Sequence, residues 1–120
     1  MPNNHGNHWL EREDVGQVTV VRLKTPKILD DDVIRAVFDP IYALSGVGRN
    51  HLVLNLALVD YLPSIALGKL VMLNRRVEVA NGRLALCQLS PTVQELLETT
   101  HLNDLFNIYA TEAEAVQSFG

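Results

Sequence analysis

The sequence predicts a single α/β domain, in which a mixed sheet of about five strands packs against about four helices. Two β-like segments open the chain, and amphipathic helices then alternate with aliphatic strands. A length of 120 residues suffices for one hydrophobic core but not for two. Residues 1–8 are polar and without periodicity, so we expect a flexible tail there and a domain over residues 9–120.

The first two strands are expected to form a hairpin. Residues 9–13 and 18–23 are separated by the turn-forming run Asp14-Val15-Gly16, and the second segment is rich in β-branched side chains. Pro26 ends the extended run because its ring fixes φ and removes a backbone donor.

A helix is expected after the hairpin, with Asp30 or Asp31 as its N-cap. Its apolar residues recur at helical spacing, which predicts one buried face formed by Val33, Val37, Ile41 and Leu44. Pro40 within this stretch predicts a kink or an early end of the helix.

The middle of the chain predicts two buried strands around a central helix. Residues 51–58 and 83–89 are largely aliphatic, as in strands that are covered on both faces of a sheet. Between them, residues 64–80 carry an apolar stripe at helical spacing, formed by Ala66, Leu70, Leu73, Val77 and Ala80. Asn81-Gly82 is expected to end this helix. The only cysteine, Cys87, is expected to be a small buried side chain.

The last third predicts a helix, a short strand and a final helix. Ser90 can cap a helix that has Pro91 in its first turn and faces the core with Val93, Leu96 and Leu97. Residues 105–110 form the expected strand. Thr111 can then cap the final helix, whose first turn carries Glu112 and Glu114 where the helix dipole favours negative charge.

Composition excludes several function classes. Fourteen acidic and ten basic residues give a net charge of -4, and no basic cluster suits nucleic acid. No segment resembles a signal peptide or membrane span, so we expect a cytoplasmic protein without membrane insertion. No metal or cofactor is expected: there is no Gly-rich phosphate loop, and the tail residues His5 and His8 lack an acidic or thiol partner.

An enzyme is not expected either. His51 and His101 lie far apart in the sequence, and no nucleophile is found beside a base. If folding brought Ser64 close to Asp60 or Asp30, a hydrolase would still be possible.

Residues 52–106 resemble the core of the STAS domain family. A buried strand and a hydrophobic turn lead into the family's Asp-Ser-Ser/Thr-Gly-Leu-Gly signature, represented here by Pro63-Ser64-Ile65-Ala66-Leu67-Gly68. Asn81-Gly82-Arg83-Leu84 is similar to the family's Gly-Gly-Arg-Leu. Leu89-Ser90-Pro91 is similar to the start of its third helix, and residues 97–106 follow its leucine, threonine, glycine, leucine and phenylalanine pattern with His101 in place of the glycine.

The resemblance implies an anti-sigma-factor antagonist, which binds an anti-sigma factor, often a serine protein kinase, and thereby frees a sigma factor. The resemblance also implies that phosphorylation of the first serine of the signature, here Ser64, ends the binding. We expect the protein to be a monomer or a weak dimer. The residues expected to contact the partner are Asp30, Pro63, Ser64, Ile65, Ala66, Lys69 and Met72.

The signature departs from the family pattern, and this keeps several interpretations open. Pro63 replaces an aspartate, Ile65 a hydroxyl residue and Ala66 a glycine. Ser64 is therefore either a phosphorylation site or only an N-cap, which stabilises a helix by about 1 kcal/mol. A non-phosphorylated scaffold, an accessory subunit of a signalling or lipid-transport complex, or a small-ligand sensor would also fit.

A second apolar series follows the central helix. Ile65, Met72 and Val79 recur at intervals of seven, with Lys69 and Arg76 close by. If these apolar side chains are exposed, they form a binding patch. The alternative is a helix buried on two sides.

Overall fold

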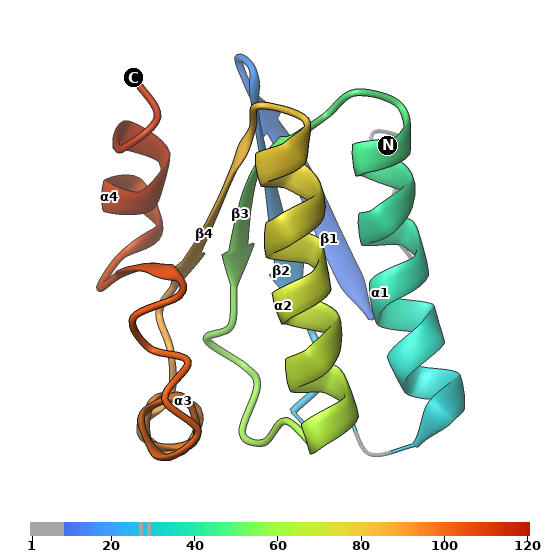
Figure 1. Ribbon diagram of the computed structural model, residues 1–120, viewed down its shortest axis with the longest axis vertical. Helices are drawn as coiled ribbons and strands as arrows, with labels where there is room; N and C mark the ends of the chain where they lie inside the picture. Colours follow the sequence, from blue (N-terminus) through green and yellow to red (C-terminus); the bar gives the residue numbers. More distant parts are fainter. Residues whose placement is uncertain (1–8, 27, 29) are drawn as a thin grey trace.

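The computed structural model describes residues 9–26, 28 and 30–120 (Figure 1). The predicted tail, with His5 and His8, lies outside the described residues. The elements in chain order are β1 (Leu10–Val15), β2 (Val18–Leu23), α1 (Asp31–Gly46), β3 (His51–Asn55), α2 (Ser64–Val79), β4 (Arg83–Cys87), α3 (Pro91–Thr99), β5 (Asn107–Tyr109) and α4 (Glu112–Gln117). The predicted α/β fold class, with a mixed five-stranded sheet, is confirmed.

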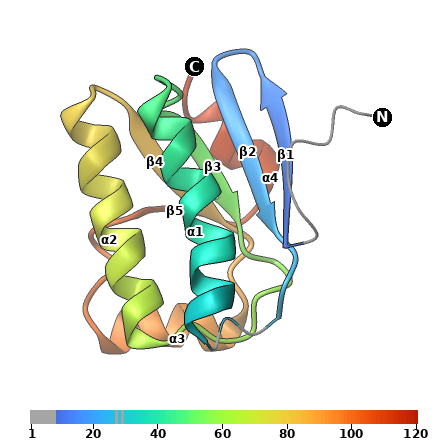
Figure 2. The ribbon, with the colours of Figure 1, turned by 90° about the vertical axis from the view of Figure 1, so that its right-hand side faces the viewer.

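The sheet follows the order of the sequence, β1-β2-β3-β4-β5. β1 and β2 form the predicted antiparallel hairpin, and all later neighbours are parallel. Gly16 in the hairpin turn has a φ of 63°, which glycine adopts without steric cost. Helices α1 and α2 lie side by side on one face of the sheet, and α4 covers the other face (Figure 2).

The main core lies between the sheet and helices α1 and α2. Phe38 and Ile41 of α1 and Leu73 of α2 are all fully buried there. A smaller core under α4 contains Ala115 and Cys87. The predicted burial of Cys87 is thus confirmed, and desolvation raises the pKa of its thiol to about 12.

Several details of the helices and strands differ from expectation. Asp14 and Val15 were expected in the hairpin turn, but they belong to β1 and pair with Thr19 and Val18. An early end of α1 at Pro40 is wrong, since the helix continues to Gly46. Ala80 is exposed, because α2 ends at Val79. The strand expected over residues 51–58 ends at Asn55, whose side-chain oxygen accepts a hydrogen bond from the backbone N–H of Ala57 at 2.9 Å and turns the chain.

The N-termini of α1 and α2 and the carboxyl ends of the parallel strands lie at one end of the molecule, the lower end in Figure 1. The hairpin turn of β1 and β2 lies at the opposite end. The loops before α1 and α2 therefore meet at the lower end, where ligands and partners of open α/β sheets commonly bind. Among the described residues, no helix is both long enough and apolar enough to cross a bilayer.

Candidate partner-binding surface

Ser64 is the first residue of α2, and Pro63 occupies the N-cap position. The N-cap has no side-chain hydrogen bond, and Ser64 is exposed. The interpretation of Ser64 as only an N-cap is therefore wrong. A capping side chain must stand one residue outside the helix to reach the first free N–H groups, and Pro63 already holds that place.

The first turn of α2 carries no side-chain charge that would compensate the positive end of the helix dipole. No acidic residue lies in its first turn, in contrast to α1 and α4, which have acidic residues there. An anion on Ser64 would lie beside the free N–H groups of this turn, where negative charge stabilises a helix. Negative charge at this position is therefore compatible with the helix dipole.

Two loops at this end of the molecule are joined to each other. The backbone N–H of Asp60 donates to the carbonyl of Pro26 at 2.7 Å, which connects the loop before α2 to the loop before α1. Asp30 is the N-cap of α1, as predicted, and its carboxylate accepts a hydrogen bond from Val33 at 2.9 Å. Within the described part of the chain, no hydrogen bond joins Ser64 to Asp60 or Asp30.

Large apolar side chains are exposed around the start of α2. Leu58 is 57% exposed and Tyr61 42% exposed in the loop before the helix, and Ile65 and Met72 on the helix are 54% and 65% exposed. Val79 at the other end of α2 is 79% exposed. The interpretation of this helix as buried on two sides is therefore wrong. Ile65, Met72 and Val79 lie on the solvent side of α2, and the stripe through Leu70 and Leu73 faces the core.

Ala66 does not lie on this surface. It is fully buried on the core-facing stripe of α2, one turn before Leu70. Its methyl group packs in the core. The prediction that Ala66 contacts a partner is therefore wrong. Gly68, in contrast, is exposed, and an added Cβ would have no heavy atom within 4 Å.

Tyr42 of α1 holds the cationic side of α2 in place. Its hydroxyl donates to the carbonyl of Lys69 at 2.8 Å, and the Lys69 Nζ lies 5.7 Å from the ring centroid. The Arg76 guanidinium lies 5.9 Å from the same centroid, and its Nε donates to Ser45 Oγ at 3.3 Å. Burial raises the pKa of the Tyr42 phenol, and nearby Arg76 partly offsets the shift. Sequence reasoning missed Tyr42, because an aromatic residue beside Ile41 is indistinguishable from a core residue.

A polar cluster on the α4 side is structural. Arg22 donates two hydrogen bonds to Glu112, at 2.9 and 2.8 Å, and Asn55 donates a third at 2.9 Å. The hydrogen bond from Arg22 is the main reason that the pKa of Glu112 is lowered, and the cluster ties α4 to the sheet. No group of three potential metal ligands occurs among the residues that the structure describes.

The comparisons with known proteins agree with this architecture. A family model described as the STAS domain matches residues 10–115. The Bordetella bronchiseptica protein BtrV, named as an anti-sigma factor antagonist, is 28% identical over 72 residues, which are 60% of this chain and 62% of BtrV. The chain thus aligns with less than two thirds of the length of that relative.

Solved structures share the fold. A Thermotoga maritima protein described as an anti-sigma factor antagonist has a TM-score of 0.81 and 24% identity, over 92% of this chain and 94% of that one. Phosphorylated SpoIIAA from Bacillus has a TM-score of 0.71 and 23% identity, over 92% of this chain and 99% of SpoIIAA. The family model extends from β1 into α4 and includes Ser64 and the exposed side of α2, and the chain therefore belongs to the STAS domain family.

Proposed function

We propose that this protein is an anti-sigma-factor antagonist that binds an anti-sigma factor and so frees a sigma factor. The observation that carries the proposal is the exposed apolar surface at the start of α2. We define this α2 surface by Leu58, Tyr61, Pro63, Ser64, Ile65, Lys69 and Met72. Family membership and the names of BtrV and the Thermotoga protein support the same role.

The composition of the α2 surface suits a protein partner. Aromatic residues and methionine are enriched at interfaces, and clustered exposed apolar side chains mark interaction sites on soluble domains. Tyr61, Ile65 and Met72 supply such side chains, and Lys69 supplies one cation beside them. A binding function of this kind needs no catalytic group and no cofactor, and it places the protein in the cytoplasm, where sigma factors act.

Phosphorylation of Ser64 by a serine-kinase anti-sigma factor is the proposed control. Three observations support it: the exposed hydroxyl, the absence of a side-chain cap at α2, and the existence of SpoIIAA structures in phosphorylated and unphosphorylated forms. The proline at position 63, in place of the family's aspartate, favours the alternative of a non-phosphorylated scaffold. The two functions differ in whether a phosphate on Ser64 ends binding.

Ile65→Glu is expected to weaken the affinity for the anti-sigma factor at least about thirtyfold, because it places a carboxylate where an apolar side chain is desolvated in the complex. The free protein should keep its stability within about 0.5 kcal/mol, since the position is exposed. Isothermal titration calorimetry measures the first effect and urea unfolding the second.

Val15→Glu is the matched control. Val15 is also an exposed aliphatic residue, 41% exposed, but lies in the hairpin at the opposite end of the molecule. It should bind like wild type. Equal affinities of wild type and Ile65→Glu would remove the α2 surface from the interface.

A further inference from the structure

The geometry points to an extension of the partner interface: the groove between α1 and α2 receives an acidic segment of the anti-sigma factor that carries an apolar side chain. This inference rests on the proposed function and specifies the chemistry of the partner. It concerns the C-terminal half of α2, beyond the part that carries the signature.

The groove is open and has apolar walls. Its volume is about 430 Å³, and its lining consists of Tyr42, Met72, Arg75, Arg76 and Val79. Pockets that hold ligand groups have volumes of roughly 300 to 1,000 Å³. Met72 and Val79 are among the most exposed apolar residues that the structure describes, at 65% and 79%. An apolar side chain of the partner can pack against both.

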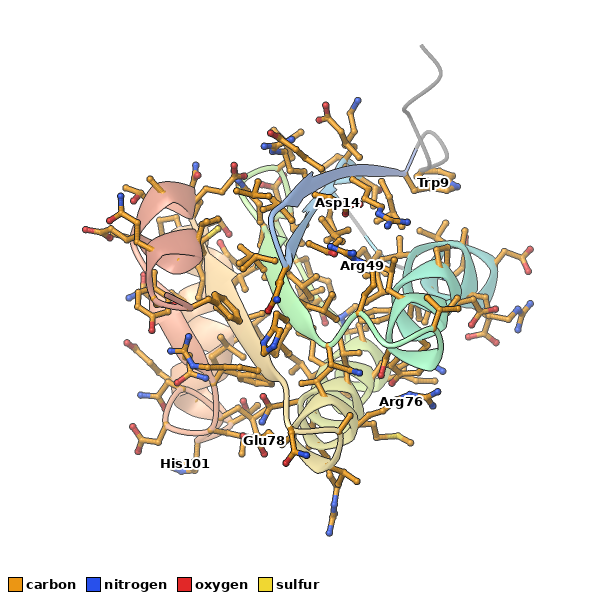
Figure 3. The ribbon with its side chains drawn as sticks, turned by 90° about the horizontal axis from the view of Figure 1, so that it is seen from above. Trp9, Asp14, Arg49, Arg76, Glu78 and His101 are labelled. Carbon is orange, nitrogen blue, oxygen red and sulfur yellow. The ribbon has the colours of Figure 1, made fainter. Side chains whose placement is uncertain are left out.

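The cations around the groove form no ion pair with the part of the chain that the structure describes. Within the described residues, no carboxylate lies within 4.0 Å of Lys69, Arg75 or Arg76. Arg76 lies on the side of α2 toward α1, whereas Glu78 lies on the opposite side of the helix (Figure 3). The described residues thus leave these cations without a direct ion pair, in a chain whose net charge is -4.

The arrangement of the arginines favours carboxylates as partners. Arg76 is held against the Tyr42 ring and Ser45, so the guanidinium loses little conformational freedom when it binds. Arg75 is exposed beside it and donates no hydrogen bond to another described residue. Guanidinium groups bind carboxylates with paired hydrogen bonds, which adds both energy and geometric selectivity.

One partner can cover both the α2 surface and the groove. Ile65 and Val79 lie about 21 Å apart along the helix, at about 1.5 Å per residue. An interface of standard size buries about 800 Å² on each partner, which is enough to span that distance. The acidic segment would then lie beside the part of the partner that contacts Ile65.

The test measures the affinity of the anti-sigma factor that binds the wild-type protein. Arg75→Glu and Val79→Asp are each expected to weaken it about tenfold. Binding of wild type should weaken as salt is raised, and Arg75→Glu should reduce that salt dependence, because the attraction is between charges. Arg12→Glu and Val15→Asp, in the hairpin, make the same chemical changes at the sheet edge and should stay within about twofold of wild type.

The outcomes separate this inference from the proposed function. If both groove variants bind like wild type while Ile65→Glu does not, the groove is not part of the interface and the proposed function stands. If the wild-type protein binds no anti-sigma factor, the proposed function is wrong and the inference fails with it. If the hairpin controls lost as much affinity as the groove variants, the effect would not be specific to the groove, and the inference would also be contradicted.

Discussion

Gly82→Ala is expected to lower the free energy of unfolding by about 3 kcal/mol or more. An added Cβ would lie 2.0 Å from the carbonyl oxygen of Asn50 and 2.5 Å from its Cβ. These atoms belong to the chain entering β3, next to the start of β4, where the N–H of Arg83 donates to the same carbonyl at 2.8 Å. The two segments would have to separate, and the hydrogen bond at the start of the β3 and β4 pairing would be lost.

Gly68→Ala is the control, and it is expected to raise the free energy of unfolding. Its Cβ would meet no atom within 4 Å, and alanine stabilises a helix interior by about 0.5 to 1 kcal/mol relative to glycine. Urea unfolding of both variants and wild type gives the comparison directly. A Gly82→Ala protein as stable as wild type would contradict the close approach of the two segments.

Phosphorylation of Ser64 is expected to weaken the affinity for the anti-sigma factor at least about a hundredfold, or about 2.7 kcal/mol. The phosphate adds about -1.5 to -2 charges at the edge of the apolar α2 surface, where a partner must desolvate it. It would also repel an acidic partner segment of the kind that the arginines of the groove attract. The folded state should tolerate the phosphate, since the first turn of α2 lacks negative charge.

Two variants separate the effect of charge from the loss of the hydroxyl. Ser64→Ala should bind but accept no phosphate, and Ser64→Asp should bind more weakly while raising the stability by about 0.3 to 1 kcal/mol. Mass spectrometry of protein incubated with kinase and ATP, followed by calorimetric titration, gives both readouts. Phosphorylated protein that binds as tightly as wild type, or a tight complex in which Ser64 stays unmodified, would favour the scaffold function.

Periodicity and capping patterns predicted the architecture correctly. The aliphatic runs of β3 and β4 and the apolar stripe of α2 fix which faces are buried, and these patterns follow directly from the geometry of strands and helices. Ser90 and Thr111 were recognisable as caps, because each precedes a helical pattern by one residue, whereas the cap of α1 was narrowed only to Asp30 or Asp31, of which Asp30 holds the position. His101, which stands after α3 in place of the family's glycine, adopts the left-handed conformation with a φ of 60°, and histidine is among the non-glycine residues that adopt it.

Features set by tertiary contacts were beyond sequence reasoning. Asn81-Gly82 was correctly placed at the end of α2, but Asn81 adopts the left-handed conformation, with a φ of 63°, and Gly82 is required by the nearby Asn50. Pro40 does not end α1, although proline lacks the N–H that would donate a helical hydrogen bond. Phe38 and Ile41, on either side of Pro40, are fully buried, and their packing against the core holds the helix together there.

The candidate site was predicted only in part. The signature placed Ser64 at the start of α2, but whether it stood at the cap or inside the helix depended on one residue, beyond the accuracy of helix boundaries read from sequence. The series Ile65, Met72 and Val79 has the same spacing whether it is buried or exposed. Tyr42 lies on α1 but contacts Lys69 and Arg76 of α2, and the residue pattern of α1 alone does not show this contact.

The central claim is tested most directly by sigma-factor release. A preformed complex of the anti-sigma factor and its sigma factor is titrated with wild-type protein, Ile65→Glu and phosphorylated protein, and free sigma factor is measured by size-exclusion chromatography. The proposed function predicts that wild-type protein displaces the sigma factor and that neither altered form does so at the same concentration. A sigma factor that stays bound in the presence of excess wild-type protein would contradict it.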